Sequence, residues 1–258
     1  MRASGSPGKE GGEIRINSGA LWCKTRDATA GARARDNSFL LVTLAAEECS
    51  SSAAAAFVAH LRAAAAALPP IAAPAFDVWD AGLTYGELLP TAIACALRRA
   101  VGLLAPPPRP GGAIFFDLGS GEGLPCLLAA ALCPEFGAIR GVELVPRLHA
   151  AAERHRALAA AALPHDAAAA ERARRVELRC GDFLEGLSLA GVDVLFLLGT
   201  CFEEDVLGPV WAAASAMRGG CVLICASHEA PASLFELLHE ERAGATWGEV
   251  TLRFYRRL

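Results

Sequence analysis

The chain has 258 residues, a hydrophobic fraction of 53% and a formal net charge of −4 at neutral pH. The length suits one sizeable domain with an extension, although much of the hydrophobic fraction is alanine, which favours helices but buries little area. The acidic balance excludes a nucleic-acid footprint spread over the whole chain, so any contact with a polyanion must be local.

The sequence favours a soluble, intracellular protein. Uninterrupted apolar stretches fall short of the ~18–20 residues of a membrane span, and the N-terminus lacks the apolar region of a secretory signal. The nine cysteines form no C-x-x-C pair and have no histidine at metal spacing. We therefore interpret them as reduced thiols and expect no metal site.

The first part of the chain is expected to be an extension. Residues 1–37 show no sustained periodicity, whereas 38–68 are predicted to form one or two Ala-rich helices that end at Pro69-Pro70. Pro69, Pro70 and Pro74 lie within six residues and together are typical of a linker. We divide the chain into a low-complexity and helical extension, 1–75, and a catalytic domain, 76–258.

In the second part, predicted helices and strands alternate. Helices are expected at about 88–104, after 123, and at 146–162, 204–217 and 233–242, and strands at 113–116, 138–143, 176–179, 192–198, 221–226 and 248–256. Pro164 is expected to split the Ala-rich stretch 159–170 between a helix end and a loop. This order predicts an α/β fold: a Rossmann-like, mostly parallel sheet with helices on both faces and an antiparallel C-terminal edge, preceded by the Ala-rich helical extension.

A glycine-rich turn follows the first predicted strand, with the sequence Asp117-Leu118-Gly119-Ser120-Gly121-Glu122-Gly123. Glycines let a ligand approach the backbone and permit positive φ. The third glycine of the dinucleotide fingerprint G-x-G-x-x-G is absent, because Leu124 stands at its position. A pyrophosphate ligand is therefore disfavoured, and a nicotinamide enzyme remains a remote alternative.

Carboxylates are expected at the ends of three neighbouring strands. Asp117 ends the first strand, Glu143 ends the second, and Asp182 with Phe183 follows the third. The carboxyl ends of parallel strands are where open α/β sheets bind ligands. Glu143 is placed to accept hydrogen bonds from ribose hydroxyls, and Asp182 could accept from an adenine amine. The anionic edge suits S-adenosyl-L-methionine, which carries ammonium and sulfonium charges.

The motifs in this order resemble a known family. Tyr85-Gly86-Glu87, Asp117 to Gly123, Gly141-Val142-Glu143 and Gly181-Asp182-Phe183 are similar to the catalytic domain of the disruptor-of-telomeric-silencing family. Its members are the histone lysine methyltransferases that lack a SET domain. The resemblance covers about 76–258, and the Tyr-Gly-Glu element is its discriminating motif, since class I methyltransferases share the others.

The resemblance implies a role for each matching position. Tyr85, Gly86, Glu87 and Leu88 would form a loop that covers S-adenosyl-L-methionine, and Glu143 would hold its ribose. Asp182 and Phe183 would hold the adenine. The methionine part would be wrapped by the turn that contains Asp117, Gly119, Ser120, Gly121, Gly123 and Leu124.

The resemblance also implies a channel for the methyl acceptor, which would be a protein lysine, with the nucleosome as a candidate partner. Tyr85, Thr200 and Phe202 are the expected catalytic residues, and Trp247 is a further candidate for the channel wall. A nuclear location follows if the acceptor is a histone, and a cytoplasmic one otherwise. Among the histidines, His228 is expected nearest the cleft.

The chain departs from the family pattern at several positions. Leu198-Gly199-Thr200-Cys201-Phe202 stands where the family has an Asn-Asn-Phe-type motif, Leu88 replaces a threonine, and Leu124 replaces a glutamine. A long Lys/Arg-rich segment after the domain is also missing. Two alternatives therefore stay open: a methyltransferase for a small molecule or a non-histone protein, and a non-catalytic relative that binds the cofactor.

Overall fold

The computed structural model describes residues 37–69, 86–163 and 165–258, with side chains described from residue 52 onward. The division between an extension and a domain at residue 75 lies outside the described residues, as does Tyr85. Contacts between backbone segments place 38–258 in one compact unit. No helix within the described residues is both long enough and apolar enough to cross a membrane.

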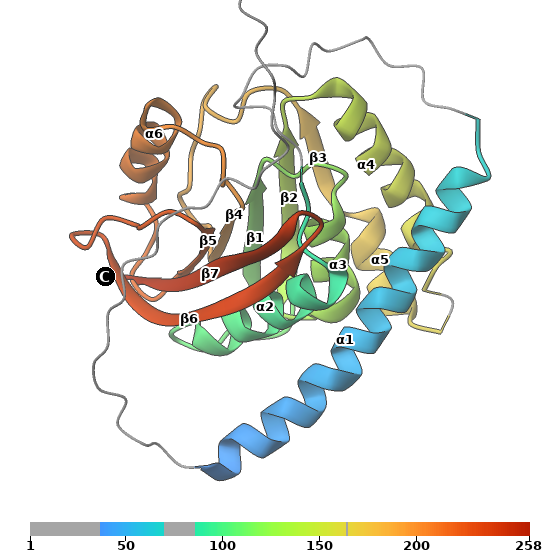
Figure 1. Ribbon diagram of the computed structural model, residues 1–258, viewed down its shortest axis with the longest axis horizontal. Helices are drawn as coiled ribbons and strands as arrows, with labels where there is room; N and C mark the ends of the chain where they lie inside the picture. Colours follow the sequence, from blue (N-terminus) through green and yellow to red (C-terminus); the bar gives the residue numbers. More distant parts are fainter. Residues whose placement is uncertain (1–36, 70–85, 164) are drawn as a thin grey trace, which may run out of the picture. The chain divides into compact units, whose positions relative to one another are not determined.

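The unit is built around one seven-stranded sheet (Figure 1) with the order β3-β2-β1-β4-β5-β7-β6. The strands are β1 (Ala113–Leu118), β2 (Phe136–Glu143), β3 (Glu177–Cys180), β4 (Val194–Leu197), β5 (Val222–Ala226), β6 (Phe235–Ala245) and β7 (Gly248–Arg257). The first five strands pair in parallel, whereas β7 pairs antiparallel with both β5 and β6. The predicted mostly parallel sheet with an antiparallel C-terminal edge is confirmed.

Helices precede β1 and follow β1, β2 and β4 along the chain. They are α1 (Asn37–Ala66), α2 (Pro90–Leu103), α3 (Leu124–Leu132), α4 (Pro146–Ala159), α5 (Ala167–Arg174) and α6 (Glu204–Ala214). Proline stands in the first turn of α2, α3 and α4, where its missing N–H costs no helical hydrogen bond.

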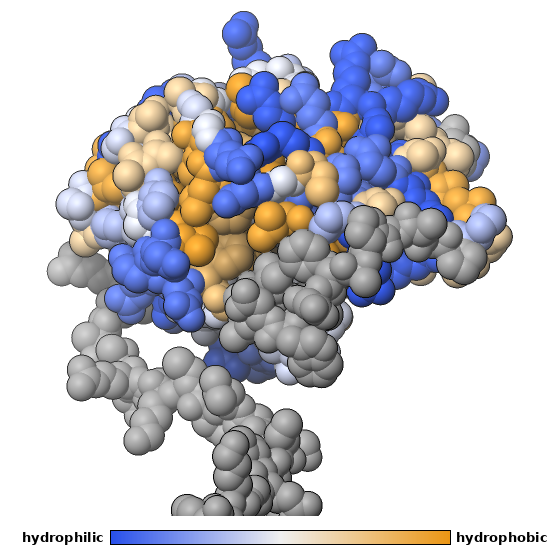
Figure 2. Space-filling model, turned by 90° about the horizontal axis from the view of Figure 1, so that it is seen from above, coloured by the Kyte–Doolittle hydropathy of each residue, from blue (hydrophilic) through white to orange (hydrophobic). Residues whose placement is uncertain are grey.

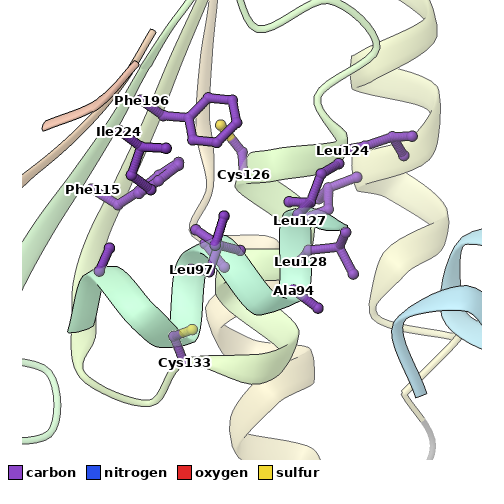
Figure 3. Close-up of a cluster of buried hydrophobic side chains, with 14 of the residues drawn as sticks. Ala94, Leu97, Phe115, Leu124, Cys126, Leu127, Leu128, Cys133, Phe196 and Ile224 are labelled. Carbon is purple, nitrogen blue, oxygen red and sulfur yellow. The ribbon is translucent and has the colours of Figure 1, made fainter. Parts of the chain in front are cut away.

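Both faces of the sheet are covered, as predicted. On one face, α2 and α3 pack against β1, β4 and β5, and Figure 3 shows Leu97 and Leu127 among the buried side chains there. On the other face, Trp211 of α6 packs in a second buried cluster with Leu195 and Leu223. Every residue of β4 and β5 is buried, as expected for central strands of a parallel sheet.

The predicted helix at 233–242 is wrong, because residues 235–242 belong to β6. Its leucines and glutamates have helical propensity, but the backbone pairs along its length with β7, from Phe235 opposite Arg257 to Ala245 opposite Gly248. Phe235 is buried against Trp211 and Tyr255. Long-range pairing and burial therefore override the local preference.

The Ala-rich stretch 159–170 also differs from its prediction. It includes the start of α5, which runs from Ala167 to Arg174, after the end of α4 at Ala159. The carboxylate of Asp166 accepts a hydrogen bond from the N–H of Ala169, 2.8 Å away, and so caps the new helix. Because of this cap, a second helix begins where a loop was expected.

Candidate functional site

The strand order indicates where a ligand would bind. The chain adds β2 and β3 on one side of β1, then β4 and β5 on the other, so the sheet has a switch point between β1 and β4. Ligands of open α/β sheets bind in the crevice at the carboxyl ends of such strands. A pocket lies there, and its lining includes Asp117 of β1 and Phe196 of β4.

The carboxyl edge lies at the top of Figure 1, where β2 continues into α4. Figure 2 looks onto the molecule from above and shows hydrophobic residues exposed between hydrophilic ones on this face. A surface of mixed polarity is usual around a small-molecule site.

The glycine-rich turn forms one wall of the pocket, and backbone hydrogen bonds hold it against β2. The N–H groups of Gly119 and Ser120 both donate to the carbonyl of Val142, at 3.0 and 2.9 Å. Gly123 has φ of 78° and directly precedes α3. A Cβ added there would lie 3.0 Å from the Cβ of Ala152 in α4, so glycine is required both by conformation and by packing.

Asp117 lies at the base of the pocket, with 1% of its surface exposed. Burial, and to a smaller extent the nearby Glu143 carboxylate, raise the pKa of Asp117 well above its usual range. The Cys126 thiol donates a weak hydrogen bond to Oδ2 at 3.9 Å, which opposes this rise. This buried carboxyl has few hydrogen-bond donors around it, so a cation that enters the pocket would stabilise its charged form.

Glu143 is also buried, and both of its carboxylate oxygens accept backbone hydrogen bonds. Oε2 accepts from the N–H of Gly121 at 2.7 Å, and Oε1 accepts from the N–H of Val145 at 2.8 Å. The side chain therefore fixes the glycine-rich turn to the end of β2. Each oxygen has a further lone pair for a ligand hydroxyl.

A second wall of the pocket is formed by Gly86–Leu88, and the segment from Gly86 to Leu89 lies along the tip of the β6–β7 hairpin. The N–H of Thr246 donates to the carbonyl of Glu87 at 2.8 Å, and the N–H of Leu89 donates to that of Gly244 at 2.8 Å. The N–H of Glu87 donates to Oγ1 of Thr246 at 3.2 Å. The side chain of Glu87 forms an ion pair with Arg62 of α1.

The loop after β4 borders the same crevice. The N–H of Phe202 donates to the carbonyl of Gly199 at 2.9 Å, and the Phe202 ring packs against Phe183 with centroids 5.6 Å apart. Nε2 of His228 is hydrogen-bonded to the same Gly199 carbonyl. His228 therefore lies beside the loop after β4.

Asp182 stands after β3, but its side chain is turned to the local backbone. Oδ1 accepts from the N–H of Leu184 at 2.8 Å. Phe183 is buried in the cluster on the α6 side of the sheet. Their expected part in adenine binding stays a prediction.

Of the fifteen residues expected to bind the cofactor or to be catalytic, eight lie in the pocket lining, six lie outside it, and Tyr85 is not among the described residues. Those in the lining are Gly86, Glu87, Leu88, Asp117, Gly119, Ser120, Gly121 and Leu124. Those outside the lining are Gly123, Glu143, Asp182, Phe183, Thr200 and Phe202. Sequence reasoning missed the lining residues Ile93, Pro125, Phe196 and Leu198. Of these, Phe196 and Leu198 could have been chosen for their place at the end of the fourth predicted strand.

The charged residues in the lining are Glu87 and Asp117, both acidic, with no Lys or Arg from the described part of the chain among them. Within the described residues, His, Cys, Asp and Glu side chains form no group of three or more that could hold a metal ion. Among the described residues, the lining itself therefore carries acidic and no basic side chains, although Glu87 is already paired with Arg62 of α1, and it suits a positively charged organic ligand better than a phosphate.

Comparisons with known proteins found no matching family model and no matching curated protein. Solved structures include a proposed RNA methyltransferase from Pyrococcus horikoshii, at 15% identity over 77% of this chain and 95% of that one, with a TM-score of 0.47. The rRNA methyltransferase aviRa from Streptomyces viridochromogenes has 19% identity over 73% and 88%, with a TM-score of 0.46. An RNA methyltransferase from Salinibacter ruber, in complex with S-adenosyl-L-homocysteine, has 18% identity over 62% and 89%, with a TM-score of 0.40. The sequence identities and the TM-scores are low in all three cases.

Proposed function

We propose that the chain is an S-adenosyl-L-methionine-dependent methyltransferase. The observation that carries this proposal is the buried carboxyl of Asp117, which lies beneath a glycine-rich turn at the switch point of the sheet, in a pocket whose charged residues are acidic. Such a pocket fits a nucleoside with a cationic group. S-adenosyl-L-methionine carries two cationic groups, the ammonium and the sulfonium.

The details of the turn favour this cofactor over a dinucleotide. Leu124 opens α3 at the position where the dinucleotide fingerprint needs a glycine, and a buried Leu side chain there lines the pocket. The lining also offers a pyrophosphate no Lys or Arg partner from the described residues. The nicotinamide alternative is therefore the weaker one.

Each part of the cofactor has a proposed partner among the described residues. Asp117 and Glu87 would face its positive charges, Glu143 would accept from the ribose hydroxyls while it holds Gly121, and Asp182 would accept from the adenine amine. The bound cofactor supplies a methyl group activated by the sulfonium. The protein contributes chiefly alignment, since a held pair of reactants can gain several kcal/mol of barrier lowering.

For the acceptor, we propose a lysine amine of a protein, on the basis of the motif resemblance. Phe202 and Phe183 form an apolar wall beside the crevice, and an apolar surrounding favours the neutral, nucleophilic form of an amine. The cofactor would supply an activated methyl group, and the lysine amine would accept it and then release a proton to solvent.

A second candidate is a methyltransferase with another acceptor, favoured by the loop after β4. Gly199 and Thr200 stand where the resembled family has asparagines, and the Phe202 ring fills the space that a side chain at Gly199 would need. A Cβ added to Gly199 would lie 2.4 Å from Cδ2 of that ring. An amide cannot be placed there without moving the ring. Small molecules, other proteins and RNA therefore belong among the acceptors to be tested.

The experiment is methyl transfer from cofactor labelled at the methyl group. The full chain is incubated with nucleosomes, with free core histones, or with a cell extract that is then separated into protein, RNA and small molecules. Label on a core histone supports the lysine proposal, and label confined to another fraction supports the second candidate. Asp117→Asn should remove the label in every fraction. Cofactor binding without label anywhere would identify a non-catalytic relative and refute the enzyme assignment.

A further inference from the structure

The indole of Trp247 lies directly against the backbone of Gly86. A Cβ added to Gly86 would lie 2.3 Å from both Cε3 and Cζ3 of the indole, a separation that real atoms do not adopt. The six-membered ring is therefore in contact with the glycine itself. Gly86 lines the pocket, whereas Trp247 stands at the tip of the β6–β7 hairpin, far away in the sequence.

This contact continues a set of hydrogen bonds. Thr246 binds both the N–H and the carbonyl of Glu87, Leu88 forms a bridge with Ala245, and Leu89 donates to Gly244. The segment Gly86–Leu89 thus lies along the hairpin like a short additional strand, and the Trp247 ring closes the end of that strand.

The exposure of Trp247 indicates that it stabilises its immediate neighbours rather than the core of the domain. Its residue surface is 47% exposed, so it contributes less to the core than a fully buried aromatic side chain would. The backbone of the segment that it contacts carries Glu87 and Leu88, and both line the pocket. The position of these two side chains therefore depends on a contact made from the other end of the chain.

We propose that Trp247 is a positioning residue for the cofactor site, and that it acts by clamping Gly86 and so fixing the pocket wall formed by Gly86–Leu88. This inference rests on the proposed function for the identity of the ligand. The steric contact itself does not depend on that identity. The clamp also gives a reason for glycine at position 86, because a larger residue would displace the ring.

The clamp predicts non-additive effects of two substitutions. Gly86→Ala should push the ring away, and Trp247→Ala should remove it, so each alone should weaken binding of S-adenosyl-L-homocysteine by about tenfold, within the usual range for residues in contact. With the ring absent, the added methyl group has no clash. The double variant should therefore bind about as well as Trp247→Ala alone.

The test is calorimetric titration of S-adenosyl-L-homocysteine into the full chain and its variants. Trp247→Phe should keep most of the affinity, because a ring still covers Gly86. Leu237→Ala is the matched control, since Leu237 is similarly exposed on β6 but far along the strand from the hairpin tip. Its affinity should equal that of the wild type. Additive losses in the double variant, or unchanged affinity in Trp247→Ala, would overturn the clamp.

A second measurement separates the clamp from the proposed function. The difference between the fluorescence spectra of the wild type and Trp247→Phe isolates the emission of Trp247 without any ligand. Gly86→Ala should shift that emission to the red, because the displaced indole becomes more exposed to water. A wild type that fails to bind S-adenosyl-L-homocysteine would sink the proposed function alone, whereas an unshifted emission would sink the clamp alone.

Discussion

Replacing Glu143 with glutamine changes one atom of the side chain and tests how the glycine-rich turn is held. The carboxylate accepts two backbone hydrogen bonds, from Gly121 and Val145. Glutamine has one acceptor oxygen, so one of the two N–H groups would face an NH₂ donor in a buried place. We then expect either the glycine-rich turn to loosen at Gly121 or the segment after β2 to loosen at Val145.

The magnitude follows from these two bonds. A hydrogen bond to a charged group is worth about 1.5–3 kcal/mol, and a buried donor without a partner costs about 1–3 kcal/mol. Relief of the repulsion between Glu143 and Asp117 offsets part of this loss. We expect Glu143→Gln to lower the free energy of unfolding by about 2–3 kcal/mol, which corresponds to roughly 4–12 °C in melting temperature for a unit of this size.

The assay is thermal and urea unfolding of the full chain, followed by titration of S-adenosyl-L-homocysteine. Glu153→Gln is the matched control, because it removes a partly exposed ion pair with Arg156 on α4 and should change stability by less than about 1 kcal/mol. Affinity for the ligand should fall in Glu143→Gln alone. Equal stability of the two variants would refute the view that Glu143 holds the turn.

Three further predictions concern the same site. Because the pKa of Asp117 is raised in the folded state, its contribution should make the free energy of unfolding fall as pH rises above about 4. The affinity for S-adenosyl-L-methionine should rise over the same pH range, because the carboxyl becomes charged. Asp117→Asn should abolish both trends in unfolding and binding titrations at several pH values. Nδ1 of buried His155 donates to the carbonyl of Glu122 in the turn at 3.2 Å, so His155→Leu should weaken cofactor binding by about tenfold, and His155→Gln should recover part of it in the same calorimetric assay. Gly123→Ala should lower the free energy of unfolding by about 1–3 kcal/mol, because Gly123 has a φ of 78° and an added Cβ would lie 3.0 Å from Ala152. Gly102→Ala in α2 is the control, since an added Cβ there meets nothing within 4 Å. It should raise the free energy of unfolding slightly, as measured by urea unfolding.

Much of the sheet could be predicted from the sequence because its central strands are marked locally. The buried runs at β1, β4 and β5 are apolar nearly throughout, and the glycines after Asp117 require a turn. Parallel strands have their carboxyl ends at one edge, so the positions of Asp117 and Glu143 near one another also followed.

The contacts that complete the pocket could not be predicted in this way. The Leu- and Glu-rich sequence of β6 has helical propensity, and only its pairing with β7 makes it a strand. The contact between Trp247 and Gly86, and the hydrogen bond of His155 to the turn, join segments far apart in the chain. Neither residue type signals such a partner, since an exposed Trp or a helical His has many other uses.

Direct titration of two cofactors into the wild-type chain is the most immediate test of the central claim that this crevice binds a cationic nucleoside. S-adenosyl-L-methionine should bind to a single site and lose affinity in Asp117→Asn, whereas nicotinamide adenine dinucleotide should give no saturable heat. Saturable binding of the dinucleotide, or no binding of S-adenosyl-L-methionine by the folded protein, would contradict the account.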